Sequence, residues 1–334
     1  MTANASAPSA LPTLAELERA SEIVREVMPP TPQQRWPLLD FRMQADVWVK
    51  HENHTPVGAF KVRGGLTFFH ELEASGALPE GVVSATRGNH GQSVALAAAR
   101  YGVKAAIVVP RGNSVEKNAA MKALGVELIE YGDDFQESLE RTEVIARERG
   151  WFRFPSFHPW LVLGVGTYAL EFFRGAPPLD HVYVPIGLGS GICGVIAARD
   201  ALGLKTKVIG VVSAHAPAYA RSLATGTLTS VPVTTILGDG MSCRTPVAEA
   251  LDAMRGRLAR VVEVTDRQLA DAMRAIFSAT HNVAEGAGAA GLAALTAEGE
   301  AMRGLRVGIV ISGGNVDRDL YARVLGGWNP EPKG

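Results

Sequence analysis

The chain contains few cysteines, and the two that it has lie far apart. Cys193 and Cys243 are the only cysteines among 334 residues, and their separation does not match a metal-ligand spacing. Two cysteines cannot form the disulfide framework that holds small secreted domains together. We therefore expect both thiols to be free and buried, and the fold to depend on its hydrophobic core.

The sequence also lacks long apolar runs and an excess of either charge. No apolar segment reaches the roughly 20 residues of a membrane-spanning helix. The 33 Lys and Arg residues nearly balance the 34 Asp and Glu residues, so no net charge attracts nucleic acid or anionic lipid. Residues 1–12 show no basic start followed by an apolar core, so we expect no secretion signal. These absences predict a cytoplasmic protein whose partner is a small molecule, with no nucleic acid and no membrane.

What the chain does contain is enough apolar sequence for two domains. Hydrophobic residues make up 47% of the chain and charged residues 20%, as in globular proteins with a large interior. A length of 334 residues suits about two compact units. Short apolar segments alternate with amphipathic ones, which predicts parallel strands flanked by helices, an α/β fold with two sheets. The expected strands are 46–50, 82–84, 105–109, 126–130, 182–186, 207–212 and 306–312.

Two capping boxes predict where helices begin. Thr13 with Glu16 opens a helix that we expect to reach about residue 27, and Thr265 with Gln268 opens another. The alanine- and glycine-rich segment 285–295 predicts a helix packed closely against its neighbours.

A lysine follows a glycine-containing loop in the segment 52–65. Lys61 stands at the expected start of a helix near Phe60, where the positive end of the helix dipole disfavours a charged amine. A lysine that is neutral part of the time can attack an aldehyde and form a Schiff base, as pyridoxal phosphate chemistry requires. Most single lysines are solvated surface residues, so Lys61 alone indicates nothing.

A polar turn follows the expected strand 82–84. Residues 86–92 read Thr-Arg-Gly-Asn-His-Gly-Gln and precede an alanine-rich helix expected over 93–100. A turn at the carboxyl end of a parallel strand presents N–H groups to a ligand. Asn89 is suited to a phenolic oxygen, and the N–H groups are suited to a carboxylate. The alternative is an ordinary strand-to-helix turn in which His90 is structural.

Glycines dominate the turn after the expected strand 182–186. Such a turn lets the backbone wrap an anion at the N-terminus of the next helix, which predicts a phosphate site. The Lys-Ser/Thr pair of a nucleotide P-loop is missing, and the glycine spacing is not that of a dinucleotide fingerprint. A tight turn without ligand is the alternative. The residues concerned are Gly187, Leu188, Gly189, Ser190 and Gly191.

Ser312 ends the last expected strand, 306–312, and is followed by two glycines. A hydroxyl at the carboxyl end of a strand is placed to meet a ring nitrogen in the cleft between domains. A simple strand-ending turn is the alternative.

Taken together and in this order, the four motifs resemble those of the fold-type II pyridoxal-phosphate enzymes, in particular threonine dehydratase and serine racemase. The resemblance spans most of the chain. It implies a two-domain fold like that of the tryptophan synthase β subunit, in which residues 1–75 and 160–334 form the large cofactor-binding domain. Residues 76–159 then form a small mobile domain. The resemblance also suggests a homodimer.

The resemblance assigns a role to each motif. It implies that Lys61 attaches pyridoxal 5'-phosphate, with Phe60 beside it, and that Asn89 contacts the ring hydroxyl. Residues 187–191 bind the phosphate, and Ser312 faces the pyridine nitrogen. A neutral hydroxyl there cannot keep the ring nitrogen protonated as a carboxylate would, which favours β-elimination over transamination. The residues implied to bind the substrate are Thr86, Arg87, Gly88 and His90.

The expected enzyme is therefore an ammonia-lyase, or dehydratase. It would convert a β-hydroxy amino acid to a 2-oxo acid and ammonia, with Lys61 removing the Cα proton. Three alternatives share the motifs: an amino-acid racemase, a β-replacement synthase that adds a nucleophile, and a catalytically silent protein that binds the cofactor. Some relatives hold a metal through acidic residues near 237–240, but only Asp239 is obvious here, and we predict no metal.

Departures from the family pattern leave the substrate open. Thr55 and Ala59 stand where dehydratases usually carry Gln and Ser, and Arg87 stands where serine racemase carries its second acid/base serine. A guanidinium stays protonated, so racemisation is disfavoured. Arg87 could bind the second carboxylate of 3-hydroxyaspartate, point into solvent, or block the pocket. The aromatic segment 155–160 would suit 3-phenylserine, and threonine and serine also remain open.

Overall fold

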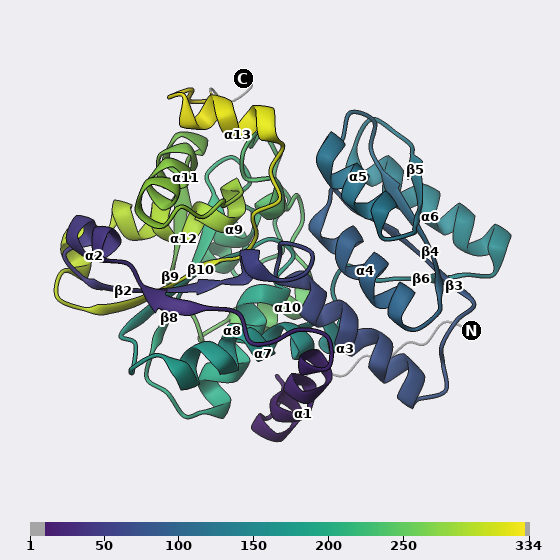
Figure 1. Ribbon diagram of the computed structural model, residues 1–334, viewed down its shortest axis with the longest axis horizontal. Helices are drawn as coiled ribbons and strands as arrows, with labels where there is room; N and C mark the ends of the chain where they lie inside the picture. Colours follow the sequence, from purple (N-terminus) through teal and green to yellow (C-terminus); the bar gives the residue numbers. More distant parts are fainter. Residues whose placement is uncertain (1–10, 331–334) are drawn as a thin grey trace.

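The computed structural model describes residues 11–330, so most of the N-terminal segment 1–12 lies outside it. It contains two separate sheets, shown in Figure 1 as two lobes. The large sheet is formed by β1 (Gln33–Arg35), β2 (Asp46–His51), β7 (His181–Pro185), β8 (Lys207–Ser213), β9 (Arg260–Val264) and β10 (Arg306–Ile311). The small sheet is formed by β3 (Gly81–Ala85), β4 (Lys104–Val109), β5 (Glu127–Glu130) and β6 (Phe152–Arg153).

Both sheets are mainly parallel, which confirms the predicted α/β class. The order is β1-β2-β10-β7-β8-β9 in the large sheet and β5-β4-β3-β6 in the small one. Among the strands of residues 11–330, only β1 pairs antiparallel, with β2. Parallel neighbours need crossover connections, and helices supply them. The helices are α1 (Leu14–Arg25), α2 (Pro37–Met43), α3 (Lys61–Ala74), α4 (Asn89–Arg100), α5 (Val115–Ala123), α6 (Phe135–Arg149), α7 (Pro159–Gly175), α8 (Ser190–Ala201), α9 (Ala218–Thr225), α10 (Ala248–Met254), α11 (Asp266–Thr280), α12 (Gly286–Ala297) and α13 (Arg318–Leu325).

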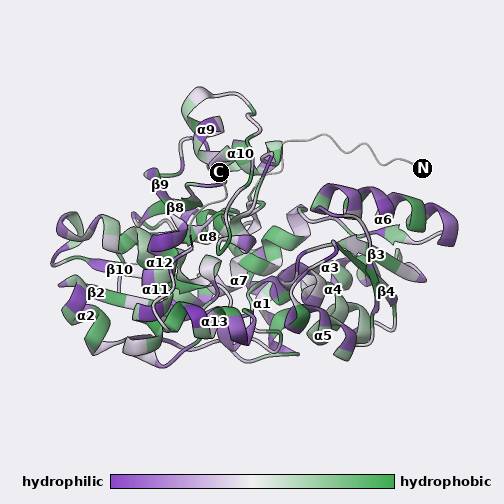
Figure 2. Ribbon diagram, turned by 90° about the horizontal axis from the view of Figure 1, so that it is seen from above, coloured by the Kyte–Doolittle hydropathy of each residue, from purple (hydrophilic) through white to green (hydrophobic). Residues whose placement is uncertain are grey.

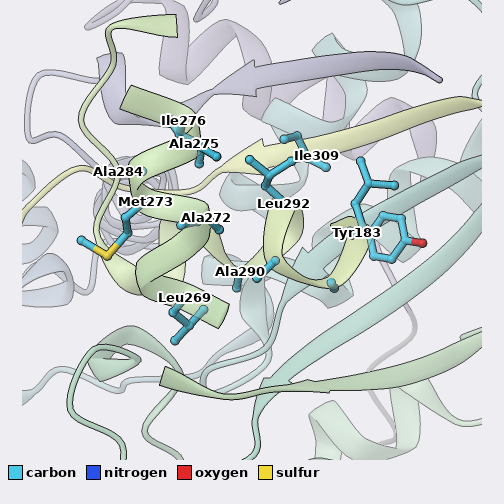
Figure 3. Packing of buried hydrophobic residues seen from close by; sticks show 14 of the residues in the cluster. Tyr183, Leu269, Ala272, Met273, Ala275, Ile276, Ala284, Ala290, Leu292 and Ile309 are labelled. Atoms are coloured by element: carbon cyan, nitrogen blue, oxygen red, sulfur yellow. The ribbon is translucent and has the colours of Figure 1, made fainter. Parts of the chain in front are cut away.

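The large sheet is buried on both faces, and its strands show the alternation that this requires. In β7, Tyr183 points into the core beneath α11 and α12, whereas Val182 and Val184 point into the core beneath α7 and α8. Figure 3 shows part of the first core, with Leu292 of α12 facing Ile309 of β10. We call this sheet with its helices the large lobe.

The small sheet is covered by α4 on one face and α6 on the other. Val82 and Ile107 belong to the core shared with α4, and Val83 and Val108 pack beneath Ile145 of α6. In Figure 2, α6 is largely purple because most of its residues are hydrophilic, and only three of them are buried. We call this sheet with α4, α5 and α6 the small lobe. Its strands all fall within residues 76–159, although where the domains divide stays a prediction.

Helix α3 lies between the lobes and touches both. A Cβ added to Gly64 would lie 2.9 Å from the carbonyl oxygen of Leu161 in α7, and one added to Gly65 would lie 2.4 Å from Ser93 Oγ in α4. Larger residues would push the helices apart, so the two glycines let α3 approach α7 and α4 closely. The first residue of α3 is Lys61, which places this lysine at the junction of the lobes.

Most of the predicted elements are present. Both capping boxes form, at Thr13 with Glu16 and at Thr265 with Gln268. Both cysteines are free and buried. Helix α4 begins at Asn89, four residues earlier than predicted. The prediction missed β1, β6 and β9, which are very short or carry charged residues and so lack an apolar pattern. No helix within residues 11–330 is long and apolar enough to cross a membrane.

Candidate active site

The loop before Lys61 is fastened to the loop after β10. Phe60 N donates to Ser312 O at 3.0 Å, and Gly314 N donates to Gly58 O at 2.9 Å. Thr55 Oγ1 accepts from Ala59 N and donates to Ala59 O, both at 2.9 Å, so this threonine stabilises the turn that leads into α3. These bonds bring Lys61 and Ser312 into one pocket although they are far apart in the sequence.

One pocket brings together every residue predicted to bind the cofactor. The predicted substrate residues do not line it, but they lie on the turn that carries Asn89. Gly240, Glu285 and Ala287 were not predicted and also face the pocket. Its lining is Phe60, Lys61, Asn89, Pro185, Gly187, Leu188, Gly189, Ser190, Gly191, Gly240, Glu285, Ala287 and Ser312.

The amine of Lys61 lies in a setting that favours its neutral form. Burial lowers the pKa of Lys61, and the nearby carboxylate of Glu285 opposes this effect without reversing it. Lys61 Nζ lies 5.0 Å from the centre of the Phe60 ring. A larger neutral fraction near pH 7 makes the amine a better nucleophile and a better base.

The glycine turn before α8 fits a phosphate. Gly189 is the N-cap of α8 with φ +108° and no side-chain cap, so the first N–H groups of the helix remain available to an anion. A Cβ on Gly187 would lie 2.3 Å from Gly240 O, so only glycine leaves room there. An anion cradle, a primary amine and the hydroxyl of Ser312 in one pocket fit pyridoxal phosphate.

We expect Gly187→Ala to weaken cofactor binding by about tenfold or more. The added methyl collides with a backbone carbonyl, and overpacking of this kind costs about 1–3 kcal/mol. Titration of the protein with pyridoxal phosphate, followed by absorption, measures the change. Gly299→Ala is the control, because its nearest neighbour, Met43, would be 3.9 Å away. Equal affinities for the two variants would show that the turn at 187 does not contact the cofactor.

Asn89 is held in one orientation by two partners. Its Nδ2 donates to Glu285 Oε1 at 2.5 Å, and its Oδ1 accepts from Asn315 Nδ2 at 2.8 Å. One N–H of the amide stays available to the pocket. Glu285 is buried and was missed as a site residue, because in the sequence it only precedes a glycine- and alanine-rich helix.

The other residues of the turn lie around Asn89. Thr86 Oγ1 accepts from Gly88 N at 3.0 Å, so this hydroxyl shapes the turn. The His90 ring packs 5.6 Å from the Phe154 ring, and burial lowers the pKa of His90 to about 3, which keeps it neutral. Arg87 is 45% exposed, and its Nε lies 3.9 Å from Asp239 Oδ1.

Asp239 belongs to the short helix η2 (Asp239–Met241) and also pairs with Lys117 of α5, at 3.3 Å. Lys117 was a second residue missed in the sequence. Within residues 11–330, no three or more His, Cys, Asp or Glu residues are grouped to hold a metal ion.

Comparisons with known proteins agree with this geometry. The family model described as pyridoxal-phosphate dependent enzyme matches residues 24–313. The chain is 32% identical to the L-threonine ammonia-lyase of Thermotoga maritima, covering 94% of this chain and 78% of the relative. It is 28% identical to the L-threo-3-hydroxyaspartate ammonia-lyase of Saccharomyces cerevisiae, and the match covers 96% of this chain and 99% of the relative. The structure of maize serine racemase superposes with a TM-score of 0.87 at 26% identity, and the superposition covers 95% of this chain and 98% of the racemase chain. The chain therefore belongs to the family of pyridoxal-phosphate dependent enzymes.

Proposed function

We propose that this enzyme is an ammonia-lyase that converts a β-hydroxy amino acid to a 2-oxo acid and ammonia. The observation that carries the proposal is the desolvated amine of Lys61, which shares a pocket with a glycine anion cradle and the hydroxyl of Ser312. Ammonia-lyases for threonine and for 3-hydroxyaspartate among the relatives support it. When bound, pyridoxal phosphate supplies the electron sink that stabilises negative charge at Cα.

The chain's own residues divide the remaining work. Lys61 would hold the cofactor through its aldehyde group, and its Nζ, once free, would be the base that takes the Cα proton. The N-terminus of α4, which has no side-chain cap, offers the N–H groups of Asn89 and His90 to the substrate carboxylate. Ser312, a neutral hydroxyl, leaves the ring a moderate sink, which favours loss of the β-hydroxyl.

Racemisation is the second candidate, because serine racemase is a close structural neighbour. It needs a base on the face opposite Lys61. On the turn 86–90, the Thr86 hydroxyl already accepts from Gly88 N, the guanidinium of Arg87 stays protonated, and burial keeps the pKa of His90 near 3. None of the three is a good proton acceptor, which supports elimination.

One assay separates the candidate functions. The protein loaded with pyridoxal phosphate is mixed with serine, threonine, 3-hydroxyaspartate or 3-phenylserine of both configurations. We expect a 2-oxo acid to form without added thiol. Formation of the mirror-image amino acid alone would favour a racemase, and turnover that requires a thiol would favour β-replacement. An absorption spectrum that no amino acid changes would indicate a silent cofactor-binding protein.

Arg87 provides a test of substrate choice. If its guanidinium binds a second carboxylate, Arg87→Ala should lower kcat/KM for 3-hydroxyaspartate about 10- to 100-fold more than for threonine. This range corresponds to a charge-assisted bond of about 1.5–3 kcal/mol. Arg111→Ala is the control, because Arg111 is an exposed residue of the same lobe that pairs with Asp133. Equal losses on both substrates would exclude the contact.

We also propose a cytoplasmic homodimer in which residues 76–159 move against the rest of the chain. Leu38 and Phe41 support self-association, because they are 59% and 84% exposed and lie one turn apart on α2. Light scattering of the purified protein measures its mass, and a monomer would exclude the dimer.

A further inference from the structure

Lys117 belongs to the small lobe, but its ammonium group contacts two carboxylates of the large lobe. Its Nζ lies 3.3 Å from Asp239 Oδ2 and 3.3 Å from Glu285 Oε2. The side chain is only 10% exposed. Its stem passes over Gly88, where a Cβ would lie 2.4 Å from Lys117 Cδ. The absence of a side chain at position 88 thus makes room for this lysine beside the cofactor turn.

An ion pair and two hydrogen bonds connect Lys117 to the cofactor pocket. Glu285 pairs with Lys117 through Oε2, at 3.3 Å, and accepts from Asn89 Nδ2 with Oε1. Asn315 Nδ2 donates to Asn89 Oδ1 and to Val57 O, both at 2.8 Å. The position of the Asn89 amide in the pocket therefore depends on where Lys117 holds Glu285.

Glu285 pairs with Lys117 and lines the same pocket as Lys61. Burial alone would lower the pKa of Lys117, but Glu285 and Asp239 outweigh it and raise this pKa, so Lys117 stays charged. Glu285 also acts on Lys61, where it opposes the lowering of the pKa by burial. Lys117 is paired with Glu285 at 3.3 Å, so we expect loss of Lys117 to leave the Glu285 carboxylate freer to attract the amine of Lys61.

We propose that Lys117 is a positioning residue that joins the lobes through Glu285 and Asp239, fixes Asn89 toward the pocket and keeps the amine of Lys61 reactive. The inference rests on the proposed function only in that Lys61 attaches pyridoxal phosphate. The contact between the lobes does not depend on the substrate.

The first test measures how fast Lys61 reacts with the cofactor. Cofactor-free full-length protein is mixed with pyridoxal phosphate, and the rate of the absorption change is recorded from about pH 6 to pH 10, across the range where a perturbed lysine titrates. In Lys117→Met, Glu285 no longer has the positive charge of Lys117 as a partner, so its carboxylate should favour the charged amine of Lys61. The pH at which the attachment rate is half of its maximum, which we call the midpoint, should then move to higher pH. A shift of about one unit makes attachment about tenfold slower below the midpoint.

Two control variants separate charge from lobe contact. Lys122→Met removes the same charge from an exposed position on the same helix and should leave the midpoint unchanged. Asp317→Ala removes another bridge between the lobes, because Asp317 accepts from Ser114 Oγ and, at 3.3 Å, from Glu116 N. It should speed hydrogen exchange in α5, as Lys117→Met should, without moving the midpoint.

If Lys117→Met alone does not fold, the inference is tested by comparing Glu285→Gln with the double variant that carries both Glu285→Gln and Lys117→Met. Glu285→Gln removes the negative charge that acts on Lys61 and leaves Lys117 in place, so the pH midpoint of cofactor attachment should move to lower pH. Adding Lys117→Met should move it back toward the wild-type value. The inference is overturned if the double variant keeps the midpoint of Glu285→Gln, or if Lys117→Met behaves like Lys122→Met in both measurements. Failure of the wild-type protein to attach the cofactor would instead refute the proposed function, and hydrogen exchange would still test the lobe contact.

Discussion

Lys61→Ala is expected to give a colourless protein with turnover at least about 10²- to 10⁴-fold below that of the wild type, the range lost with a positioned proton-transfer group. The variant loses both the amine that bonds the cofactor aldehyde and the base for the Cα proton. The fold should survive, because Lys61 is the first residue of α3 and forms no side-chain hydrogen bond or ion pair with the described residues.

The measurement combines absorption of the dialysed protein with the rate of 2-oxo acid release. Lys205→Ala is the matched control, because Lys205 is an exposed lysine of the large lobe. This variant should keep the cofactor absorption and the rate of 2-oxo acid release of the wild type. A small primary amine added to Lys61→Ala should restore part of the activity, because it can enter the space left by the side chain and act as the base. A coloured, active Lys61→Ala protein would remove the basis of the proposed function.

The second large effect concerns a buried cluster of charges beneath α3. Arg63 lies 2.8 Å from Glu52 and 2.8 Å from Glu171, and Lys50 lies 2.7 Å from Glu171. The Arg63, Glu52 and Lys50 side chains are fully buried, and Glu171 is 7% exposed. Two cations and two anions balance, so removing one of them leaves a buried charge without a partner.

Arg63→Met is therefore expected to lower the free energy of unfolding by about 3–5 kcal/mol, the usual cost of breaking a buried pair. Urea unfolding should show a lower midpoint with an unchanged slope. Arg19→Met is the control, because Arg19 of α1 pairs at 3.5 Å with Glu71 of α3, the helix that carries Arg63, but is 57% exposed. This substitution should lower the free energy of unfolding by less than about 1 kcal/mol. Similar losses for both variants would mean that water reaches the cluster.

Local patterns predicted the parts of the site that one segment provides. Lys61 follows a loop and opens a helix, and the glycines at 187–191 join a strand to a helix, so their chemistry is readable from neighbouring residues. The resemblance to a family then supplied the pairing of these segments. The alternation of short apolar segments with amphipathic ones indicated the two sheets, because a strand buried on both faces is apolar along most of its length.

Residues that act across the lobes were not predictable in this way. Lys117 looks like an ordinary charged residue of an amphipathic helix, and Glu285 looks like the start of another helix. Their partners are set by how the lobes meet, which no local pattern encodes. Arg87 is similar, because the carboxylate with which it pairs, that of Asp239, comes from the other lobe.

The strand order of the large sheet has a consequence for synthesis of the chain. Strand β10, the last strand within residues 11–330, pairs with β2 on one side and β7 on the other. While the ribosome is still making β7, β8 and β9, the position between β2 and β7 is empty, and Ser312 does not yet exist. The nascent chain therefore cannot complete the large sheet or the pocket that Ser312 lines, and late insertion of a central strand should make folding slow.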